Sequence, residues 1–202
     1  MGRPREFEPE TVLKAAYEVF WTKGYEATST RALSEATGLT AASIYNAFGD
    51  KRGLFIAAIE HYLDNTLRDR IARHSAVASP AEAITGYIRE TVDRALADPR
   101  HRGCLLVNTA LEVTSDDAEL QTLVINETKT ISAFFRRIIA AGQKNGTFPA
   151  KQSADDLANN LMALILGLRV LARIGADAKL FDSLIRPSLV QLGLRWPNTK
   201  IA

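Results

Sequence analysis

The chain has 202 residues, of which 47% are hydrophobic and 24% are charged, and its formal net charge is +2. This length is enough for one large or two small domains with a sizeable core, and the apolar content excludes a disordered chain. Every apolar run is shorter than the roughly 18 residues that cross a bilayer, and none follows the basic N-terminus. We therefore expect a cytoplasmic protein without a membrane span or a secretory signal.

Cysteine and histidine content argues against a metal site or a disulfide. Cys104 is the single cysteine, and the three histidines, His61, His74 and His101, form no ligand pair at helical spacing. We expect no metal and no cofactor. Net charge gives no indication of DNA binding, because residues 1–73 contain ten basic and ten acidic side chains. Only the placement of the charges can be informative.

Hydrophobic periodicity predicts a first helix that begins at Pro9 and ends before Gly24. Proline suits a first helical position, where its missing N–H is not needed, and glycine suits the residue after a helix. The expected buried face repeats with helical spacing and consists of Val12, Ala15, Ala16, Val19 and Phe20.

Capping residues divide the following segment into further helices. Ser29 or Thr30 can cap one helix, which Gly38 ends, and Thr40 can cap the next. The helices expected here span about residues 30–36, 41–47 and 51–73, the last of them long.

The rest of the chain predicts more helices behind a linker of small residues at 75–79. They span about residues 80–97, 104–114, 117–145, 153–174 and 178–193. Pro187 should kink or split the last helix. No stretch alternates with the period of a strand. The fold class is therefore all-α, with about nine helices.

Residues 29–48 show the clearest functional pattern, because they fit a helix-turn-helix. Such a motif needs a short positioning helix, a tight turn and a second helix that enters the major groove. Gly38 tolerates the positive φ of the turn. Ala41 and Ala42 can contact thymine methyl groups, and Asn46 can pair with adenine. A plain helical hairpin without a role in DNA binding is the alternative interpretation.

The N-terminal region resembles the DNA-binding domain of the TetR family of transcriptional regulators. The resemblance is carried by Gly24-Tyr25, Thr28-Ser29, Gly38-Leu39-Thr40, Tyr45, Phe48 and Lys51, at the family's spacing. It implies a DNA-binding domain over residues 1–65, joined by the long fourth helix to a helical ligand-binding and dimerisation domain over residues 66–202. The chain departs from the family at Ala47, where a histidine is common, so this position is not counted as a DNA contact.

The resemblance also implies which side chains meet DNA. Phosphate contacts in the family match Thr28, Ser29, Tyr45 and Lys51, although Thr28 can instead cap and Tyr45 can instead pack. Arg31 matches a position from which some members reach a base, and the N-terminal arginines resemble a basic arm that enters the minor groove. The complete predicted set is Arg3, Arg5, Thr28, Ser29, Arg31, Thr40, Ala41, Ala42, Ser43, Tyr45, Asn46 and Lys51.

A homodimer is expected, because one small domain makes few base contacts. Specific binding uses two copies that read the half-sites of a palindromic operator about 34–36 Å apart. Leucines in the 153–174 helix step by four and three, as in a coiled-coil seam, and the resemblance implies dimerisation through the last two helices. The predicted interface is Leu157, Leu161, Leu164, Leu168, Leu171, Leu184 and Leu189. The alternative is that the seam packs inside a single chain.

Polar side chains on apolar helices in the second half indicate a pocket for a small molecule, because such pockets combine apolar walls with a few polar anchors. The candidates are Cys104, Asn108, Glu112, Asn126, Thr130, Phe134, Met162, Leu166 and Arg169. Residues 103–108 resemble a segment of a TetR subgroup in which some members sense electrophiles or oxidants through such a cysteine. A helix N-terminus and nearby arginines acidify a thiol, whereas a lone cysteine is usually a small buried hydrophobe.

Together these observations predict a DNA-binding transcriptional regulator, a repressor that a small-molecule inducer of unknown identity releases from its operator. Activation or control of many sites is the alternative within this class. Three other hypotheses are a redox-sensing repressor that uses Cys104, a small helical enzyme that uses Cys104 or Glu112, and a purely structural helical dimer. An enzyme nucleophile needs a base nearby, and His101 is the only candidate, so we expect no catalytic residues.

Overall fold

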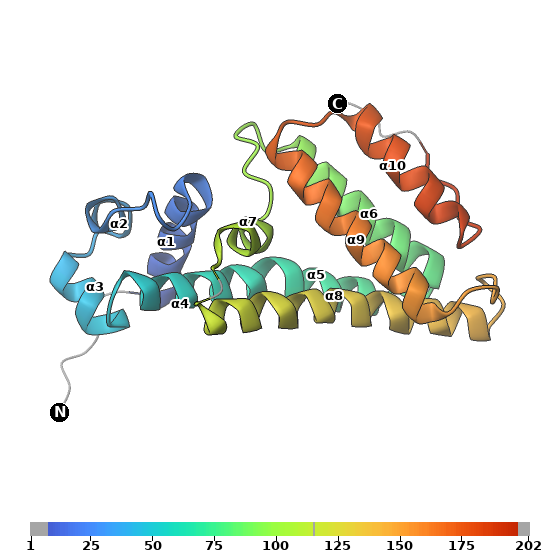
Figure 1. Ribbon diagram of the computed structural model, residues 1–202, viewed down its shortest axis with the longest axis horizontal. Helices are drawn as coiled ribbons and strands as arrows, with labels where there is room; N and C mark the ends of the chain where they lie inside the picture. Colours follow the sequence, from blue (N-terminus) through green and yellow to red (C-terminus); the bar gives the residue numbers. More distant parts are fainter. Residues whose placement is uncertain (1–7, 115, 198–202) are drawn as a thin grey trace.

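The computed structural model describes residues 8–114 and 116–197, and this part of the chain is helical without strands (Figure 1). Its elements are α1 (Pro9–Lys23), α2 (Thr30–Thr37), α3 (Ala41–Phe48), α4 (Lys51–Leu63), η1 (Asp64–Arg68), α5 (Asp69–Ser75), α6 (Pro80–Leu96), α7 (Leu105–Glu112), α8 (Ala118–Lys144), α9 (Ala154–Arg173) and α10 (Ala178–Val190). Because α4, η1 and α5 follow one another without a gap, the described residues form nine helices in space. The predicted all-α fold is confirmed.

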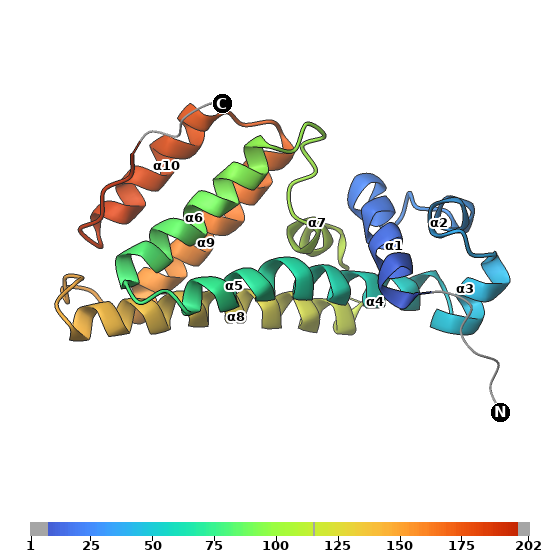
Figure 2. The ribbon, with the colours of Figure 1, turned by 180° about the vertical axis from the view of Figure 1, so that it is seen from behind.

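Helices α1, α2 and α3 form a small bundle at one end of the molecule, against the first turns of α4 (Figures 1 and 2). Each contributes a large side chain to a shared core, because Phe20, Leu33 and Ile44 are at most 1% exposed. Phe55 of α4 meets Phe20 edge to face, with ring centres 4.9 Å apart. This packing holds α2 and α3 in a fixed position on α4.

The helix that leaves this bundle is longer than an ordinary connector and is not uniform. A π-helical turn, η1, lies between α4 and α5, whereas the sequence predicted one α-helix from 51 to about 73. Arg68 ends this turn and forms ion pairs with Glu60 and Asp64 of its own helix and with Glu127 of α8. The wider turn shifts the faces of α5 relative to those of α4.

The larger part of the molecule is built on α8, which lies along the α4–α5 helix in both views (Figures 1 and 2). Helices α6 and α9 contact each other and α8, and α10 covers their outer side. Tyr87, Phe135, Ile165 and Phe181, from four different helices, are completely buried where these elements meet. None of the described helices is long and apolar enough to cross a membrane.

Helix α10 continues through Pro187, so the predicted split at this residue is wrong. A proline inside a helix removes one main-chain hydrogen bond. Pro187 lies three residues before the end of α10 and is exposed, where water can satisfy the carbonyl that loses its partner. The helix therefore ends at Val190 rather than at the proline.

Candidate nucleic-acid interface and internal pocket

The segment from α2 to α3 has the geometry of a helix-turn-helix. Ser29 caps α2 by accepting a hydrogen bond from the Ala32 backbone nitrogen at 3.2 Å. Thr40 caps α3 by accepting one from the Ser43 backbone nitrogen at 3.1 Å. Gly38 ends α2 with a φ of 73°, in the left-handed region that favours glycine. Two caps and one glycine thus fix a very short turn between the helices.

Helix α3 presents a face to solvent that we call the recognition face: Ala41, Ala42, Tyr45 and Asn46. These residues lie on the side opposite the buried Ile44. Tyr45 is 45% exposed, and its hydroxyl oxygen lies 3.5 Å from that of Thr30, so its ring is not part of the core. The recognition face consists of small or polar uncharged side chains, which is the chemistry that suits close approach to base edges in the major groove.

Thr28 does not belong to this surface. Its side chain is 2% exposed, and its hydroxyl donates a hydrogen bond to the Gly24 carbonyl oxygen at 2.6 Å. The prediction that Thr28 contacts a phosphate is therefore wrong, because the hydroxyl closes the turn after α1. Ser43 is half-buried, with its hydroxyl 3.0 Å from that of Thr40, so it supports the cap of α3. Its contact with DNA remains a prediction.

Lys51 opens α4, shortly after α3 ends at Phe48. Its Nζ atom lies 4.3 Å from the centre of the Tyr25 ring and 3.4 Å from the Glu26 carbonyl oxygen. The ring and the carbonyl hold the ammonium group in one place without neutralising its charge. Such a fixed cation next to a recognition helix is suited to a phosphate of the DNA backbone.

The remaining predicted basic contacts are less firmly placed. Arg31 of α2 points into solvent, with its side chain 88% exposed, and pairs with Glu35 at 2.8 Å. An exposed pair of this kind is weak, so Arg31 can exchange its partner for a base or a phosphate. Arg3 and Arg5 lie outside the described residues.

The helix-turn-helix unit is joined to the larger part of the molecule through α1. The indole Nε1 of Trp21 donates a hydrogen bond to the Arg102 backbone carbonyl oxygen at 3.0 Å. The Arg102 side chain pairs with Glu18 of α1. Glu112 of α7 accepts a hydrogen bond from the Tyr25 backbone nitrogen at 2.9 Å. Glu112 therefore lies at the junction between the two parts of the chain.

A fourth contact between the helix-turn-helix unit and the larger part of the molecule involves the start of α4. Arg52 forms ion pairs with Asp117 and Glu119 at the start of α8, each at 2.7 Å. No local pattern connects these residues, which are more than sixty positions apart along the chain. Their pairing ties the residue next to Lys51 to the first turn of α8.

The nine predicted ligand residues do not meet in one place. Cys104, Leu166 and Arg169 line an enclosed hollow together with Tyr62 and Thr66. Thr130 and Phe134, by contrast, line an open hollow on the outer side of α8, and Phe134 itself is 3% exposed. Glu112 lines a further hollow with Tyr25 and Thr109.

Three other candidates are engaged elsewhere. The amide nitrogen of Asn108 donates a hydrogen bond to the Arg102 carbonyl oxygen at 3.0 Å, so this side chain fixes the segment before α7. Asn126 is exposed on α8, and Met162 is half-buried against the core. Neither of these two lines a hollow that also contains Arg169.

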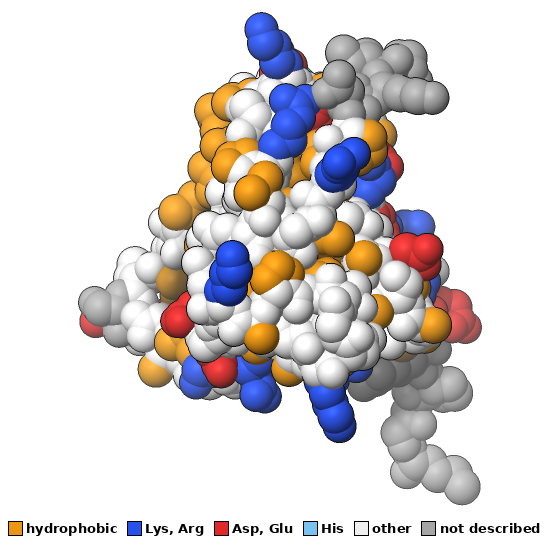
Figure 3. All heavy atoms as spheres, turned by 90° about the vertical axis from the view of Figure 1, so that its right-hand side faces the viewer, with side chains coloured by type: hydrophobic (Ala, Val, Ile, Leu, Met, Phe, Trp, Pro, Cys, Tyr) orange, Lys and Arg blue, Asp and Glu red, His pale blue; other side chains and the backbone are white. Residues whose placement is uncertain are grey.

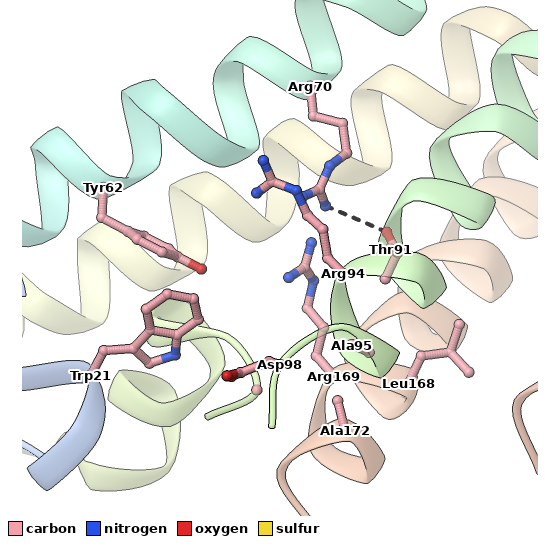
Figure 4. A pocket seen from close by; sticks show the side chains of 11 residues that line it. Trp21, Tyr62, Arg70, Thr91, Arg94, Ala95, Asp98, Leu168, Arg169 and Ala172 are labelled. Carbon is pink, nitrogen blue, oxygen red and sulfur yellow. Dashed lines mark hydrogen bonds between the residues drawn. The ribbon is translucent and has the colours of Figure 1, made fainter. Parts of the chain in front are cut away.

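A cavity of about 50 Å³ lies between α1, the α4–α5 helix, α6 and α9 (Figure 4). Figure 4 shows the guanidinium groups of Arg70, Arg94 and Arg169 gathered on one side of it. The aromatic rings of Trp21 and Tyr62 lie across from them. We call this space the arginine pocket. Arg169 lines both this pocket and the hollow that contains Cys104.

Arg70 is almost completely enclosed, with 1% of its surface exposed. Its Nε atom lies 3.1 Å from Glu90, and one of its terminal nitrogens lies 3.4 Å from the Thr91 hydroxyl oxygen. Burial, and then the like charge of Arg169, lower the pKa of Arg70. The fold therefore places this cation where a positive charge is costly.

Glu90 is the carboxylate that offsets this cost, and several cations share it. Arg73 and His74 from α5, and Arg94 from its own helix, also lie within ion-pair distance of it. Burial alone would raise the pKa of Glu90, but hydrogen bonds from Arg73 and the charge of Arg70 hold this pKa at about 2. One carboxylate thus faces four basic side chains.

Arg169 differs from Arg70 because it forms no ion pair with any carboxylate in the described part of the chain. The groups nearest to it are the Cys104 thiol and the hydroxyls of Tyr62 and Tyr87. The Tyr62 hydroxyl donates a hydrogen bond to the Cys104 Sγ at 3.7 Å. Burial alone would raise the pKa of the Cys104 thiol, but the charge of Arg169 and hydrogen bonds from the Val107 backbone and the Tyr62 hydroxyl together lower this pKa.

The arginine pocket includes residues that the sequence interpretation missed, namely Trp21, Tyr62, Arg70 and Arg94. One signal was present, because Arg70 follows the buried Leu67 by three positions and therefore continues the apolar side of its helix. An arginine in such a position needs a partner or a ligand. The other three became visible only when the helices were assembled.

Four members of the predicted leucine seam lie inside the chain, so the assignment of these four to a partner is wrong, and the contact of the other three with a partner remains a prediction. Four of its seven members are at most 3% exposed: Leu157, Leu161, Leu168 and Leu189. Leu164 and Leu171 are half-buried against the same core, and Leu184 is 37% exposed. The heptad spacing marks the side of α9 that packs against the rest of its own chain.

The outer sides of α9 and α10 carry a different set of apolar residues, which we call the α9–α10 outer face: Val170, Ile174, Leu180 and Leu184. All four are exposed, Ile174 by 74%. Figure 3, which looks at the α10 end of the molecule, shows hydrophobic side chains gathered over its upper left part. Gly167 lies on the same stripe of α9, with open space beyond its Cα atom.

Two family models match the chain, one for each of its parts. The model described as bacterial regulatory proteins, tetR family, matches residues 12–58. The model described as tetracyclin repressor-like, C-terminal domain, matches residues 80–187. The first match covers most of α1, all of α2 and α3 and the first half of α4, and the second covers α6 to most of α10.

Similar proteins cover nearly the whole chain. YezE of Bacillus subtilis, an uncharacterized HTH-type transcriptional regulator, is 34% identical over 88% of this chain and 92% of its own. The HTH-type transcriptional repressor ComR of Escherichia coli is 28% identical over 87% and 84%. A cysteine mutant of the TetR family transcriptional regulator CifR, solved with 26-bp double-strand operator DNA, is 32% identical and matches with a TM-score of 0.83 over 95% of this chain and 100% of that one.

Proposed function

The chain belongs to the TetR family of transcriptional regulators, and from this premise we propose that it is a homodimeric repressor that leaves a palindromic operator when a small molecule enters the arginine pocket. The observation that carries the proposal is the recognition face of α3, which is exposed and uncharged and is followed in the chain by the fixed cation Lys51 at the start of α4. The repressor name of ComR and the operator DNA bound to CifR support it.

On DNA, α3 enters the major groove with the recognition face toward the bases. Ala41 and Ala42 meet thymine methyl groups, and the Asn46 amide pairs with an adenine edge. Ser29 and Thr40, at the starts of the two helices, and Lys51 contact backbone phosphates on either side. These contacts position the domain, while the α3 side chains provide the sequence preference.

Dimerisation uses the α9–α10 outer face. Its exposed side chains form one apolar surface, which a second copy would remove from water. Gly167 lets the partner helix approach closely, because its missing side chain leaves open space. A dimer formed in this way presents two recognition faces to half-sites about 34–36 Å apart.

Release follows from the links between the pocket and α1. Trp21 lines the arginine pocket and is hydrogen-bonded to Arg102, and Glu112 holds the Tyr25 backbone. A molecule in the pocket therefore acts on the helix that packs against α2 and α4. The molecule lowers DNA affinity only if it binds more tightly to a dimer whose two recognition faces do not match the spacing of the half-sites. Equal affinity for the matching and the non-matching dimer would leave their populations unchanged.

In vitro selection of bound duplex DNA, followed by fluorescence anisotropy with the selected sequence, tests the proposal. Asn46→Ala should cost roughly 1–3 kcal/mol of discrimination at one base position. Asn126→Ala, which removes an exposed asparagine of α8, should bind like the wild type. The proposal fails if no duplex, including the DNA that flanks the protein's own gene, is bound at low salt.

A second candidate mechanism is sensing of electrophiles through Cys104. It is favoured by the contact of Tyr62 with the thiol and by the lowered thiol pKa. Addition of the thiolate to N-ethylmaleimide forms a carbon–sulfur bond, and solvent supplies the proton. N-ethylmaleimide should then release wild-type protein from DNA but not Cys104→Ser. Equal release of both proteins contradicts this mechanism.

We propose no enzymatic activity for the chain. The similar proteins named above are transcriptional regulators. His101, the candidate base, is exposed and its ring lies beside Gly175. It is thus directed toward the end of α9, and the thiol of Cys104 meets Tyr62 instead.

A further inference from the structure

We propose that the arginine pocket binds the oxyanion group of a small molecule, a carboxylate or a phosphate, through the guanidinium groups of Arg70, Arg94 and Arg169. This inference rests on the proposed ligand response and adds the chemical class of the ligand. It is carried by the charges that line the pocket, by the absence of a carboxylate for Arg169 within residues 8–114 and 116–197, and by the aromatic walls.

The lining of the pocket is strongly cationic. Its acidic lining residue is Asp98, which is already occupied, because it accepts hydrogen bonds from the Arg102 backbone nitrogen at 2.9 Å and side chain at 3.2 Å. Glu90 is not a lining residue of this pocket; it contacts Arg70 and is shared among four basic side chains. The pocket therefore keeps an excess of positive charge.

Arg169 makes this excess most evident. The side chain of Arg169 is only partly exposed. No carboxylate in the described part of the chain lies within ion-pair distance of it. A partly buried charge without a counter-ion destabilises the fold. The guanidinium groups of Arg70 and Arg94 lie close to it (Figure 4) and add repulsion. An oxyanion placed among the three groups would remove this cost and accept charge-assisted hydrogen bonds.

The size and walls of the pocket restrict the anion further. About 50 Å³ is room for a compact group of a few heavy atoms, since one water molecule needs roughly 10–15 Å³. The opposite wall is formed by Trp21 and Tyr62, and Leu168 and Ala172 add apolar surface on the α9 side (Figure 4). A small organic acid, with its carboxylate at the arginines and its apolar part on the aromatic rings, matches this arrangement. A phosphate group matches the arginine side of the pocket but has no apolar part for the aromatic side.

Binding can be measured on the intact protein with three probes at constant ionic strength: acetate, its neutral isostere acetamide, and inorganic phosphate. Isothermal titration calorimetry gives the affinity, and in the Trp196→Phe variant the fluorescence of Trp21 reports from the pocket itself. We expect acetate, phosphate or both to bind, and acetamide to bind about tenfold more weakly than acetate, because it lacks the charge.

Arg169→Gln should weaken anion binding about tenfold or more, as expected for the loss of a charged hydrogen bond. It should not lower the melting temperature of the ligand-free protein, since it removes an unpaired charge. Arg94→Gln is a second test at a position with a side chain 52% exposed, where folding tolerates the change. Arg136→Gln, an exposed arginine of α8 outside the pocket, is the matched control and should bind like the wild type.

The possible outcomes distinguish a carboxylate ligand from a phosphate ligand. They also distinguish failure of this inference from failure of the proposed repressor function. Arginine-dependent binding of acetate assigns a carboxylate, and arginine-dependent binding of phosphate assigns a phosphate. Binding of neither anion at tens of millimolar, equal binding of acetamide and acetate, or unchanged affinity in both arginine variants overturns the inference and leaves the repressor proposal intact. Anion binding that leaves the affinity for DNA unchanged keeps the pocket and overturns the proposed release.

Discussion

Trp21 in α1 and Arg102 in the segment before α7 are held together by two contacts. The indole Nε1 donates a hydrogen bond to the Arg102 carbonyl oxygen at 3.0 Å, and the guanidinium carbon lies 4.1 Å from the centre of the indole ring. The same carbonyl oxygen accepts a hydrogen bond from the Asn108 amide. Because Trp21 also lines the arginine pocket, this pair joins the pocket directly to the helix-turn-helix unit.

Trp21→Phe should weaken this connection while keeping an aromatic ring in place. We expect the free energy of unfolding in urea to fall by about 1 kcal/mol, the usual contribution of one hydrogen bond. Anisotropy titrations should also show a smaller effect of pocket ligands on DNA affinity. Trp196→Phe is the matched control, because its indole donates to Asp182 far from α1. An equal loss of ligand response in both variants would contradict the role given to Trp21.

Lys51→Gln should reduce DNA affinity without changing sequence preference. The logarithm of the affinity falls with the logarithm of salt concentration by about 0.9 per phosphate contacted. Losing the Lys51 contact should therefore make this slope shallower by about one unit per half-site. Anisotropy over a salt series measures the slope, and Lys144→Gln at the end of α8 serves as the control. A slope that stays unchanged would rule out the phosphate contact.

Ile174→Asp should separate the dimer into monomers that remain folded. Ile174 is 74% exposed in the single chain, so the charge costs little there but is costly inside an interface. Size-exclusion chromatography with light scattering gives the mass, and circular dichroism confirms folding. Leu111→Asp, at a residue of α7 that is 71% exposed, should remain dimeric. A dimeric Ile174→Asp would show that dimerisation uses another surface.

Glu90→Gln should destabilise the protein strongly at neutral pH and much less in acid. Removing this carboxylate leaves Arg70 buried without its counter-ion, which costs roughly 3–5 kcal/mol. In the folded protein the pKa of Glu90 is about 2, below its ordinary value of 4.5. The stabilisation is therefore complete above the ordinary pKa and is lost as the pH falls toward 2.

Urea unfolding of wild type and Glu90→Gln between pH 7 and pH 3 measures this dependence. The difference in free energy of unfolding should stay nearly constant from pH 7 to about pH 5 and shrink as the pH is lowered further. Glu35→Gln provides the control, because Glu35 forms an exposed pair with Arg31 that contributes little at any pH. A difference between wild type and Glu90→Gln that is constant across this range would contradict the assigned pKa.

The helices could be predicted from the sequence because their ends are determined locally. Ser29, Gly38 and Thr40 cap or end their helices through bonds to residues at most four positions away. The recognition face follows from the same local information, since Ile44 sets which side of α3 is buried. Thr28 is the exception, because a hydroxyl that could meet a phosphate is instead turned back onto the Gly24 carbonyl oxygen.

Features that depend on how distant helices meet could not be predicted. A leucine seam shows which side of α9 is apolar, but not whether that side meets its own chain or a partner. Leu161 and Leu168 proved to be internal, while Val170 and Ile174 lie outside. The arginine pocket combines side chains from α5, α6 and α9, whose crossing is not encoded in any single segment.

The unbroken run of α4, η1 and α5 has a mechanical consequence. Lys51 and Arg70 lie on this one rod, about 28 Å apart at roughly 1.5 Å of rise per residue. A tilt of about 5° around the arginine end would therefore swing the lysine end by about 2–3 Å. In a dimer two such lever arms move together. Under the proposed release mechanism, small adjustments around an anion would be magnified at the DNA, whose fixed helical repeat leaves little tolerance for the altered distance.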